Sequence, residues 1–179
     1  PEVIAAALRA GAHLVNDVRA LRTPGALAAA AAQNAAVCVM HMQGEPATMQ
    51  ADPRYDDVVA EVREFLRART SACREAGIAG DSICIDPGIG FGKTYQHNVE
   101  LLRHQRAFTD LGYPLLIGVS RKALIGIMTG RPARERVVGS AVAAAFAVQA
   151  GAAIIRAHDV AATVDAVKVA VALRSREAK

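Results

Sequence analysis

The segment from Asp86 to Lys93, DPGIGFGK, is the part of the chain whose residue types and spacing best suit chemistry. A carboxylate ends an apolar run there, and three glycines follow at alternate positions, where the backbone can pass close to a ligand. Pro87 stands where a Walker A loop needs glycine, and Gly92 comes one place early for a G-x-G-x-x-G dinucleotide loop. We interpret Asp86 as an acceptor for a ring N–H and an amino group of a ligand, or as a cap of its own loop.

Two further segments combine cations with hydrogen-bonding side chains. Ser120, Arg121 and Lys122 end one apolar run, and Arg156 and His158 end the last one. Fixed Arg and Lys donors stabilise negative charge as it develops on a leaving group. The alternative is a solvated basic rim, which suits Arg156 poorly because that residue directly follows Ala-Ala-Ile-Ile, where an unpartnered charge is costly.

Asn16 and His41 are weaker candidates. Asn16 ends the first apolar run and can read the edge of a heterocycle or satisfy strand backbone, since its amide is both donor and acceptor. His41, next to Met40, has no second histidine at metal spacing, so it is interpreted as a core residue or an apolar pocket wall. The sequence contains no Ser-His-Asp order, no H-E-x-x-H and no evident pair of catalytic carboxylates.

These side chains end five short apolar runs, which are typical of strands covered on both faces. The predicted strands are 13–17, 36–42, 82–86, 115–120 and 154–158. Caps, prolines and glycines predict helices over 24–34, 52–76, 96–111, 134–150 and 163–174, after a helix that opens at Pro1.

The β-α unit thus repeats about five times, which predicts right-handed crossovers and a parallel sheet. An open doubly wound sheet and a (β/α)8 TIM barrel both satisfy this order. We favour the barrel, because the carboxyl ends of its strands converge on one mouth, whereas an open sheet uses mainly the strand ends at its switch point.

Composition describes a globular core. The chain has 179 residues, 53% of them hydrophobic, 21% charged and 4% aromatic, with a net charge of +4. No basic stripe with aromatics indicates nucleic-acid binding, and no apolar run is long enough to suggest a membrane span. Cysteines without C-x-x-C spacing, two of them in strand-like runs, indicate buried hydrophobes and a reducing compartment. With no secretory signal evident, we expect a cytoplasmic protein.

Taken together, LVNDV, VCVMHMQGEPATMQ, DPGIGFGKT, GVSRK and IIRAHDV resemble, in this order and spacing, the dihydropteroate synthases of the pterin-binding (β/α)8-barrel group. The resemblance implies an enzyme that condenses 6-hydroxymethyl-7,8-dihydropterin pyrophosphate with p-aminobenzoate, giving 7,8-dihydropteroate and pyrophosphate for folate synthesis. It further implies inhibition by sulfonamide drugs, Mg²⁺ in the intact enzyme and a homodimer formed through C-terminal helices.

The resemblance also assigns roles to residues. The catalytic residues would be Lys122, Arg156 and His158, of which Arg156 and His158 would hold the pyrophosphate. The pterin would be bound by Asn16, Met40, Asp86, Phe91, Gly118, Lys122 and Arg156, with the Arg156 guanidinium over its face. Ser120, Arg121 and Lys122 would line the aminobenzoate side. Pyrophosphate departure followed by attack of the neutral arylamine needs anion stabilisation and positioning more than a strong base.

Two departures from the family pattern stand out. Ala123 replaces a serine that many relatives have after SRK, which puts one contact to the aminobenzoate carboxylate in doubt. The opening motif N-x-T-P-D-S-F, with its metal-contacting Asn, is absent, as is the third-strand Asp. We therefore expect residues 1–179 to be the C-terminal part of a single pterin-binding barrel domain, carrying strands four to eight, with little turnover alone. A pterin-binding methyltransferase domain and a degenerate non-catalytic relative are the alternatives.

Overall fold

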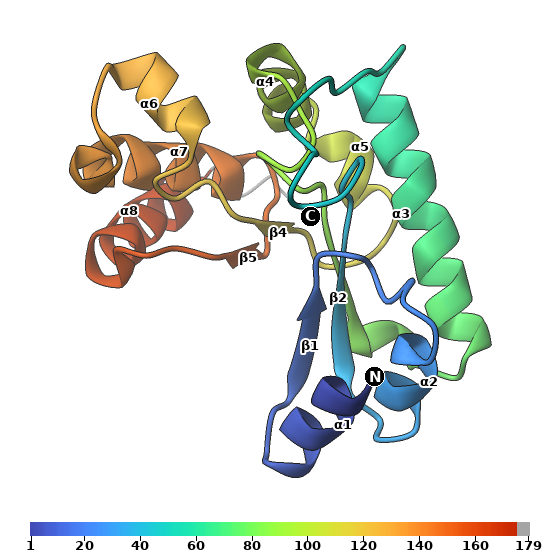
Figure 1. Cartoon of the computed structure of the whole chain (residues 1–179). Coiled ribbons are helices and arrows are strands. Elements are labelled where there is room, and N and C mark those ends of the chain that lie inside the picture. Colours follow the sequence, from blue (N-terminus) through green and yellow to red (C-terminus); the bar gives the residue numbers. More distant parts are fainter. Residues whose placement is uncertain (175–179) are drawn as a thin grey trace.

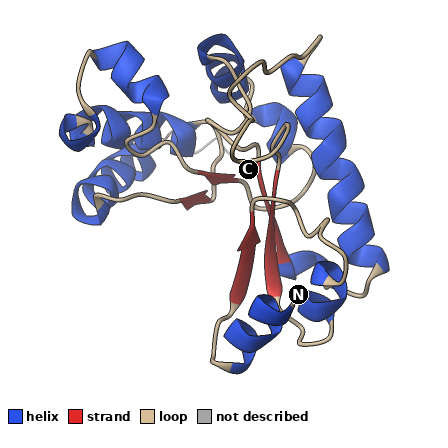
Figure 2. Cartoon of the chain, viewed as in Figure 1, coloured by secondary structure: helices blue, strands red, loops and turns tan. Residues whose placement is uncertain are grey.

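The computed structural model describes residues 1–174 of the chain, and in this part each strand is followed by one or two α-helices (Figures 1 and 2). The strands of this part are β1 Leu14–Asp17, β2 Ala36–Met40, β3 Ile83–Asp86, β4 Leu116–Ile117 and β5 Ile154–Ile155. All five predicted strands are confirmed, but most are shorter than expected at their carboxyl ends. There the chain turns into loops that carry the polar side chains.

The connecting helices also follow the predicted order. They are α1 Glu2–Arg9, α2 Ala26–Ala31, α3 Val58–Glu75, α4 Tyr95–Arg103, α5 Arg106–Thr109, α6 Ala123–Thr129, α7 Val137–Gln149 and α8 Val160–Leu173, with short 3₁₀ turns η1 Gly80–Ser82 and η2 Ala133–Glu135.

The strands are parallel and lie side by side in chain order. β1 pairs with β2 and β2 with β3, β4 pairs with β5, and a parallel bridge between Ile85 and Leu115 joins the two sheets. A doubly wound sheet reverses its strand order at a switch point, and this one does not. Consecutive order is what a (β/α) barrel requires, so the predicted barrel topology holds over the part that the structure describes.

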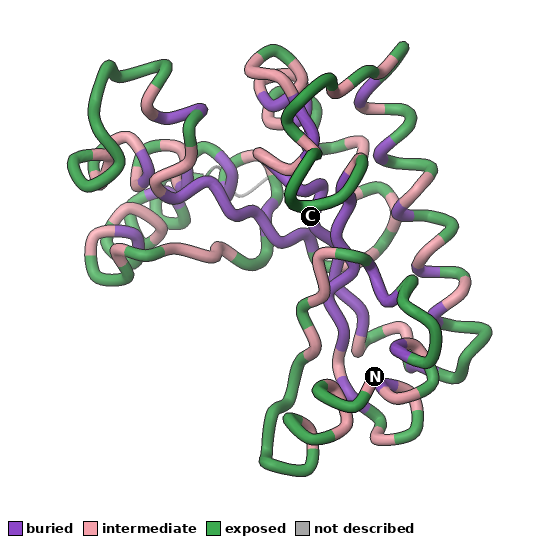
Figure 3. The backbone as a smooth tube through the Cα atoms, viewed as in Figure 1, coloured by how far each residue is buried: buried purple, intermediate pink, exposed green. Residues whose placement is uncertain are grey.

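The two faces of the sheet are buried in different ways, as the period of two along a strand dictates. Val37, Val39 and Ile85 face the helices and belong to the main hydrophobic core, which is buried along the strands in Figure 3. Cys38 and Cys84 face the opposite side, with Leu116, in a second small cluster. Because Met40 and Asp86 follow at the next positions of the same face, the second cluster forms the floor beneath them.

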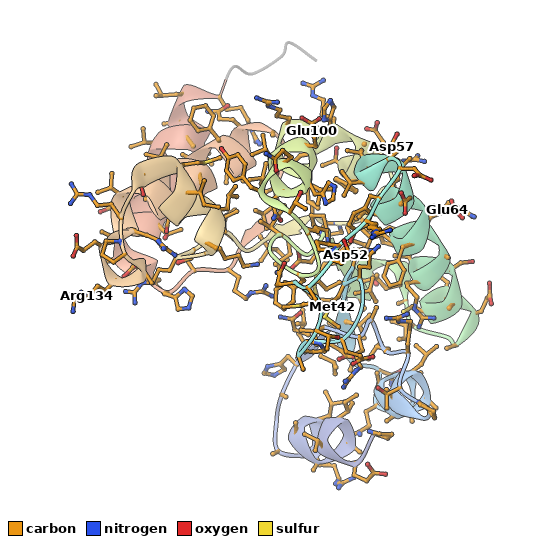
Figure 4. The ribbon with its side chains drawn as sticks, turned by 45° about the horizontal axis from the view of Figure 1, so that its top comes forward. Met42, Asp52, Asp57, Glu64, Glu100 and Arg134 are labelled. Atoms are coloured by element: carbon orange, nitrogen blue, oxygen red, sulfur yellow. The ribbon has the colours of Figure 1, made fainter. Side chains whose placement is uncertain are left out.

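Two helix predictions were wrong in detail. Residue 52 does not begin the long helix: Asp57 caps α3 by accepting hydrogen bonds from Val59 and Ala60, and Asp52 lies in the loop before it (Figure 4). The helix predicted over 96–111 is divided into α4 and α5. The helix α6 was not predicted, because its seven residues include Gly126 and two isoleucines, which are poor helix signals.

The three cysteines, Cys38, Cys73 and Cys84, are buried free thiols, as predicted for the two in strand-like runs, Cys38 and Cys84. Within residues 1–174, no helix combines the length and the apolar character needed to cross a membrane.

Candidate active site

Asp86 and Arg156 form the centre of the site, at the carboxyl ends of β3 and β5. The Asp86 side chain is 1% exposed; its Oδ1 accepts from the Gly88 N–H at 2.7 Å, and its Oδ2 lies 3.3 Å from Arg156 Nη2. Burial raises the pKa of Asp86, while the Gly88 hydrogen bond and nearby cations oppose that rise. The carboxylate was predicted as a ligand acceptor or a loop cap, and its contact with Gly88 shows that it does cap the loop.

Gly118 allows Arg156 to reach Asp86 across β4. A Cβ at Gly118 would lie 2.8 Å from Arg156 Nη2 and 3.3 Å from its Cζ, so the guanidinium rests directly on this glycine. Arg156 is anchored by its backbone N–H, which donates to the Ile117 carbonyl at 3.0 Å. A side chain at position 118 would therefore push the guanidinium away from the carboxylate.

Lys122 approaches from the start of α6 and lies against the glycine loop. Its Nζ donates to the Ile89 carbonyl and stands 4.7 Å from the centre of the Phe91 ring, while Gly90 leaves room for its aliphatic stem. Burial lowers the pKa of Lys122 to about 8, with Asp86 opposing the effect. Lys122 and Phe91 are thus brought together, as the predicted site requires.

His158 and Ser120 meet on the other side of Arg156. The His158 backbone N–H donates to Ser120 Oγ at 3.1 Å, and the ring Nδ1 is 3.0 Å from the same oxygen. A cavity of about 160 Å³ opens here, lined by Gly118, Ser120, Lys122, Arg156, Ala157 and His158. Lys122, Arg156 and His158, the three residues predicted to be catalytic, therefore line one cavity, and its size suits a phosphate-sized group.

Arg121 points elsewhere and holds the loops. Its guanidinium makes two hydrogen bonds to Asp159, at 3.0 and 2.5 Å, and its backbone N–H donates to Ser140 Oγ at 2.9 Å. Its φ of 58° is in the left-handed region, where a non-glycine residue is strained. Arg136 donates to the carbonyls of Arg121 and Lys122 and so supports this turn. Neither Arg136 nor Ser140 was predicted, since they carry no motif and act only through the turn.

Met40 and Asn16 lie on the same face as Asp86, on the neighbouring strands. Met40 is the register partner of Asp86 and is 1% exposed, whereas Asn16 is exposed on β1, one strand farther away. His41 is buried, as predicted for a core or wall residue, and burial beside Lys93 and Arg22 lowers its pKa to about 3. A planar ligand on Asp86 would thus have Met40 at its side.

Each glycine of the loop admits a different neighbour. A Cβ at Gly88 would collide with the His41 carbonyl oxygen, and one at Gly92 with the Gln43 carbonyl oxygen. Both glycines, like Gly90, have positive φ. The loop after β3 is therefore pressed against the end of β2. The sequence predicted a close approach to a ligand, and this contact between two backbone segments was not predicted.

The donor set does not fit a metal. Within residues 1–174, no three His, Cys, Asp or Glu side chains are placed to hold one ion, and Asp86 is already engaged by Gly88 and Arg156. What the site offers is one buried carboxylate for a polar ring edge and, next to it, a cationic cavity for an anion.

This fold and site define a protein of the parallel α/β-barrel class with a buried carboxylate beside a cationic cavity. A family model described as "Pterin binding enzyme" matches residues 1–158, and the chain belongs to that family. Its relatives include dihydropteroate synthases. The enzyme of Haemophilus influenzae is 49% identical over 167 residues, which make up 93% of this chain and 61% of that protein.

Two solved structures extend the comparison. A Yersinia pestis dihydropteroate synthase in a sulfonamide drug complex is 45% identical, with a TM-score of 0.94 over 97% of this chain and 63% of its own. The Thermus thermophilus enzyme, in complex with 6HMPPP, is 46% identical, with a TM-score of 0.93 over 98% of this chain and 70% of its own. The chain thus spans about three fifths of the curated relative it matches.

Proposed function

We propose that this chain supplies the pterin- and pyrophosphate-binding part of a dihydropteroate synthase, which joins 6-hydroxymethyl-7,8-dihydropterin pyrophosphate to p-aminobenzoate. The observation that carries the proposal is the position of Arg156, which contacts Asp86 and also lines the cavity with Lys122 and His158. The Arg156 guanidinium therefore contacts the carboxylate that suits the edge of a pterin, and it also borders the cavity that suits an anion.

The chemistry follows from these positions. Asp86 and Asn16 bind the ring, and the pterin face lies beside Met40 and Arg156. As the bond between the methylene carbon and the bridging oxygen breaks, its electron pair leaves with pyrophosphate, and the cationic residues stabilise the growing negative charge. The amine nitrogen of p-aminobenzoate then forms the new C–N bond and releases a proton to water. Positioning supplies the remaining acceleration.

The aminobenzoate side is proposed to lie beyond Lys122. A cavity of about 350 Å³ there is bounded in part by Phe91, Lys122 and Ala123. Ser120 Oγ is engaged by His158 and Arg121 by Asp159, so we expect these two to shape that side rather than to grip the carboxylate. Because the Yersinia relative binds a sulfonamide drug, we propose that such drugs bind this chain at the same side.

A binding experiment tests the proposal. We expect the pyrophosphate ester of 6-hydroxymethylpterin to bind at least tenfold more tightly than the free alcohol, and Arg156→Met to abolish this difference. Lys168→Met, which removes an exposed lysine on α8, should leave both affinities unchanged. Equal affinity of the wild-type chain for the two pterins would overturn the proposal and favour a pterin-binding methyltransferase, which has no use for an anion clamp.

We also propose a homodimer, with a second copy of the chain on α7. Val138, Val142 and Phe146 are spaced by four residues along one side of this helix and are 71%, 50% and 71% exposed. Such a stripe is typical of an association surface. Phe146→Glu should convert a dimer to a monomer in sedimentation velocity, with Arg134→Glu, a charge change on an exposed residue outside α7, as the control. A wild-type chain that sediments as a monomer at micromolar concentration would contradict this.

We further propose that the protein is located in the cytoplasm and that the intact enzyme uses Mg²⁺. Three free buried thiols support a reducing compartment. Mg²⁺ is expected for the intact enzyme on the family resemblance alone, and the described residues offer no ligand set for it. The proposed roles of Asp86, Lys122, Arg156 and His158 do not depend on the metal.

A further inference from the structure

Lys93, the last residue of the DPGIGFGK segment, is buried between the end of β2 and the loop after β3, with 3% of its surface exposed. Its Nζ lies 2.9 Å from His41 Nδ1 and 2.9 Å from the Phe91 carbonyl oxygen, and a longer contact of 3.4 Å reaches the His41 carbonyl. Because a lysine ammonium has only donors, His41 Nδ1 accepts and the ring proton of His41 is on Nε2.

The buried position of the Lys93 ammonium is energetically unfavourable. Its three nearest partners are neutral groups, since burial and the neighbouring cations keep His41 unprotonated at neutral pH. Moving an ammonium out of water is costly unless hydrogen bonds and opposite charge compensate it. Burial accordingly lowers the pKa of Lys93 to about 7, with Asp86 opposing the fall. Such a residue is better explained by a task at the site than by packing.

Of the two partners of Lys93, one follows a predicted pterin-site residue and the other is such a residue. His41 directly follows Met40, and Phe91 provides both the carbonyl for Lys93 and the ring that contacts Lys122. Gly88 meets the His41 carbonyl in the same place, so the strand end and the loop touch without intervening side chains. The Lys93 ammonium adds side-chain hydrogen bonds across this contact.

We propose that Lys93 is a positioning residue of the pterin site. It ties His41 at the end of β2 to Phe91 in the loop after β3, fixes Met40 and Phe91 relative to Asp86, and places a positive charge behind the Asp86 carboxylate. This role rests on the proposed function, because it presumes that a pterin binds at Asp86.

The electrostatic effect of Lys93 on Asp86 depends on the other charged and titratable groups nearby. Asp86 and Lys122 act on Lys93 through space, and the Tyr55 ring lies 6.0 Å from its Nζ. His41 contacts it directly, and Arg22 acts in turn on His41. Lys93, Lys122 and Arg156 all favour the ionised form of Asp86. Removing Lys93 alone should therefore make Asp86 take up a proton at a higher pH.

The experiment compares Lys93→Met, Lys93→Gln and the control Lys168→Met in the full chain. Amide hydrogen exchange measures the protection of residues 41–43 and 87–93, and the fluorescence of 6-hydroxymethylpterin measures its affinity from pH 4 to 9. We expect Lys93→Met to lose protection in both segments, to bind pterin about tenfold more weakly, and to lose binding in acid at a higher pH than wild type. Lys93→Gln keeps amide donors, so it should recover much of the protection while retaining the shifted acid limb.

The outcomes distinguish the contact between strand and loop from the role of Lys93 at the pterin site. Unchanged protection in Lys93→Met would overturn the tie between strand and loop, whether or not pterin binds. Lost protection with unchanged pterin affinity and an unchanged acid limb would overturn the positioning role. If the wild-type chain binds no pterin, the proposed function fails and the role at the pterin site fails with it, while hydrogen exchange still decides the tie. Should Lys93→Met fail to fold, Lys93→Gln supplies the affinity and pH measurements.

Discussion

The carboxylate of Asp86 and the guanidinium of Arg156 meet across an intervening strand, with 3.3 Å between Oδ2 and Nη2. Their residues are separated by 70 positions in the chain. Asp86 is buried, whereas 39% of the Arg156 side chain is exposed. Solvent and ligands therefore reach the pair from the Arg156 side. An incoming ligand can therefore displace Arg156 from Asp86 and engage both.

Gly118→Ala should separate this pair. The new Cβ would lie 2.8 Å from Arg156 Nη2, so the guanidinium must move from Asp86 and from the small cavity. We expect affinity for inorganic pyrophosphate, measured by calorimetry, to fall about tenfold, as for the loss of one charged hydrogen bond. Gly77→Ala is the control: its φ of 92° makes alanine strained there, but nothing else lies within 4 Å and the site is remote. Equal pyrophosphate affinity in wild type and Gly118→Ala would refute this account.

The stability of the chain should rise in mild alkali because of Lys93. Its pKa is lowered from 10.5 to about 7 in the folded state, so between these values the unfolded state binds more protons than the folded state. The free energy of unfolding then increases with pH by about 1 kcal/mol per unit within that window and is flat below it. Urea titrations at pH 7, 8 and 9 should show this gain in wild type and a smaller gain in Lys93→Met. Parallel curves for the two proteins would contradict the prediction.

The ion pair between Arg121 and Asp159 should stabilise the chain only where Asp159 is ionised. Arg121 lowers the pKa of Asp159 below its ordinary value, so the contribution is complete above about pH 4 and is lost as the pH falls through the lowered value. We expect Arg121→Ala to reduce the free energy of unfolding at pH 6 and to approach wild type in stronger acid. Asp159→Asn should have the same effect at pH 6. The double variant should be no less stable than either single variant, because both substitutions remove the same interaction.

Ala123→Ser should strengthen p-aminobenzoate binding. Position 123 opens α6, is exposed, and borders the cavity shared with Phe91 and Lys122, so a hydroxyl fits without displacing other groups. One added hydrogen bond to a carboxylate predicts an affinity gain of about tenfold in a pterin-saturated titration. Ala123→Val adds bulk without a donor and should give no gain. A serine variant that binds as weakly as wild type would place the carboxylate elsewhere.

The strand ends could be predicted from sequence because a parallel sheet brings them to one edge. The pattern of apolar runs ending in Asp86, Lys122 or Arg156 was enough to place these residues together. The direction of a side chain beyond its strand was harder. Arg121 sits beside Lys122 in sequence, yet its left-handed backbone turns its guanidinium to Asp159. That conformation depends on Ser140, which is 19 residues away and carries no local signal.

The segment from Asp86 to Lys93 shows the same limit from another side. Its glycines are visible in the sequence, but their neighbours are not, since the segment containing His41 and Gln43 reaches them only through the fold. Lysine is a residue type that is usually exposed, and Lys93 is nevertheless buried. Its contacts with His41 and Phe91 arise only from the placement of β2 against β3.

The alternation in the loop after β3 also bears on how this segment can change by mutation. At 88, 90 and 92, every substitution adds atoms where the backbone just after β2 or the stem of Lys122 already lies, on a backbone with positive φ. Ile89, between two of them, is completely buried in the main core. Amino-acid replacements at these three glycines are therefore expected to disturb the loop, so the three positions should tolerate little variation. Variation that adapts the site to new ligands must enter through other elements, such as the start of α6.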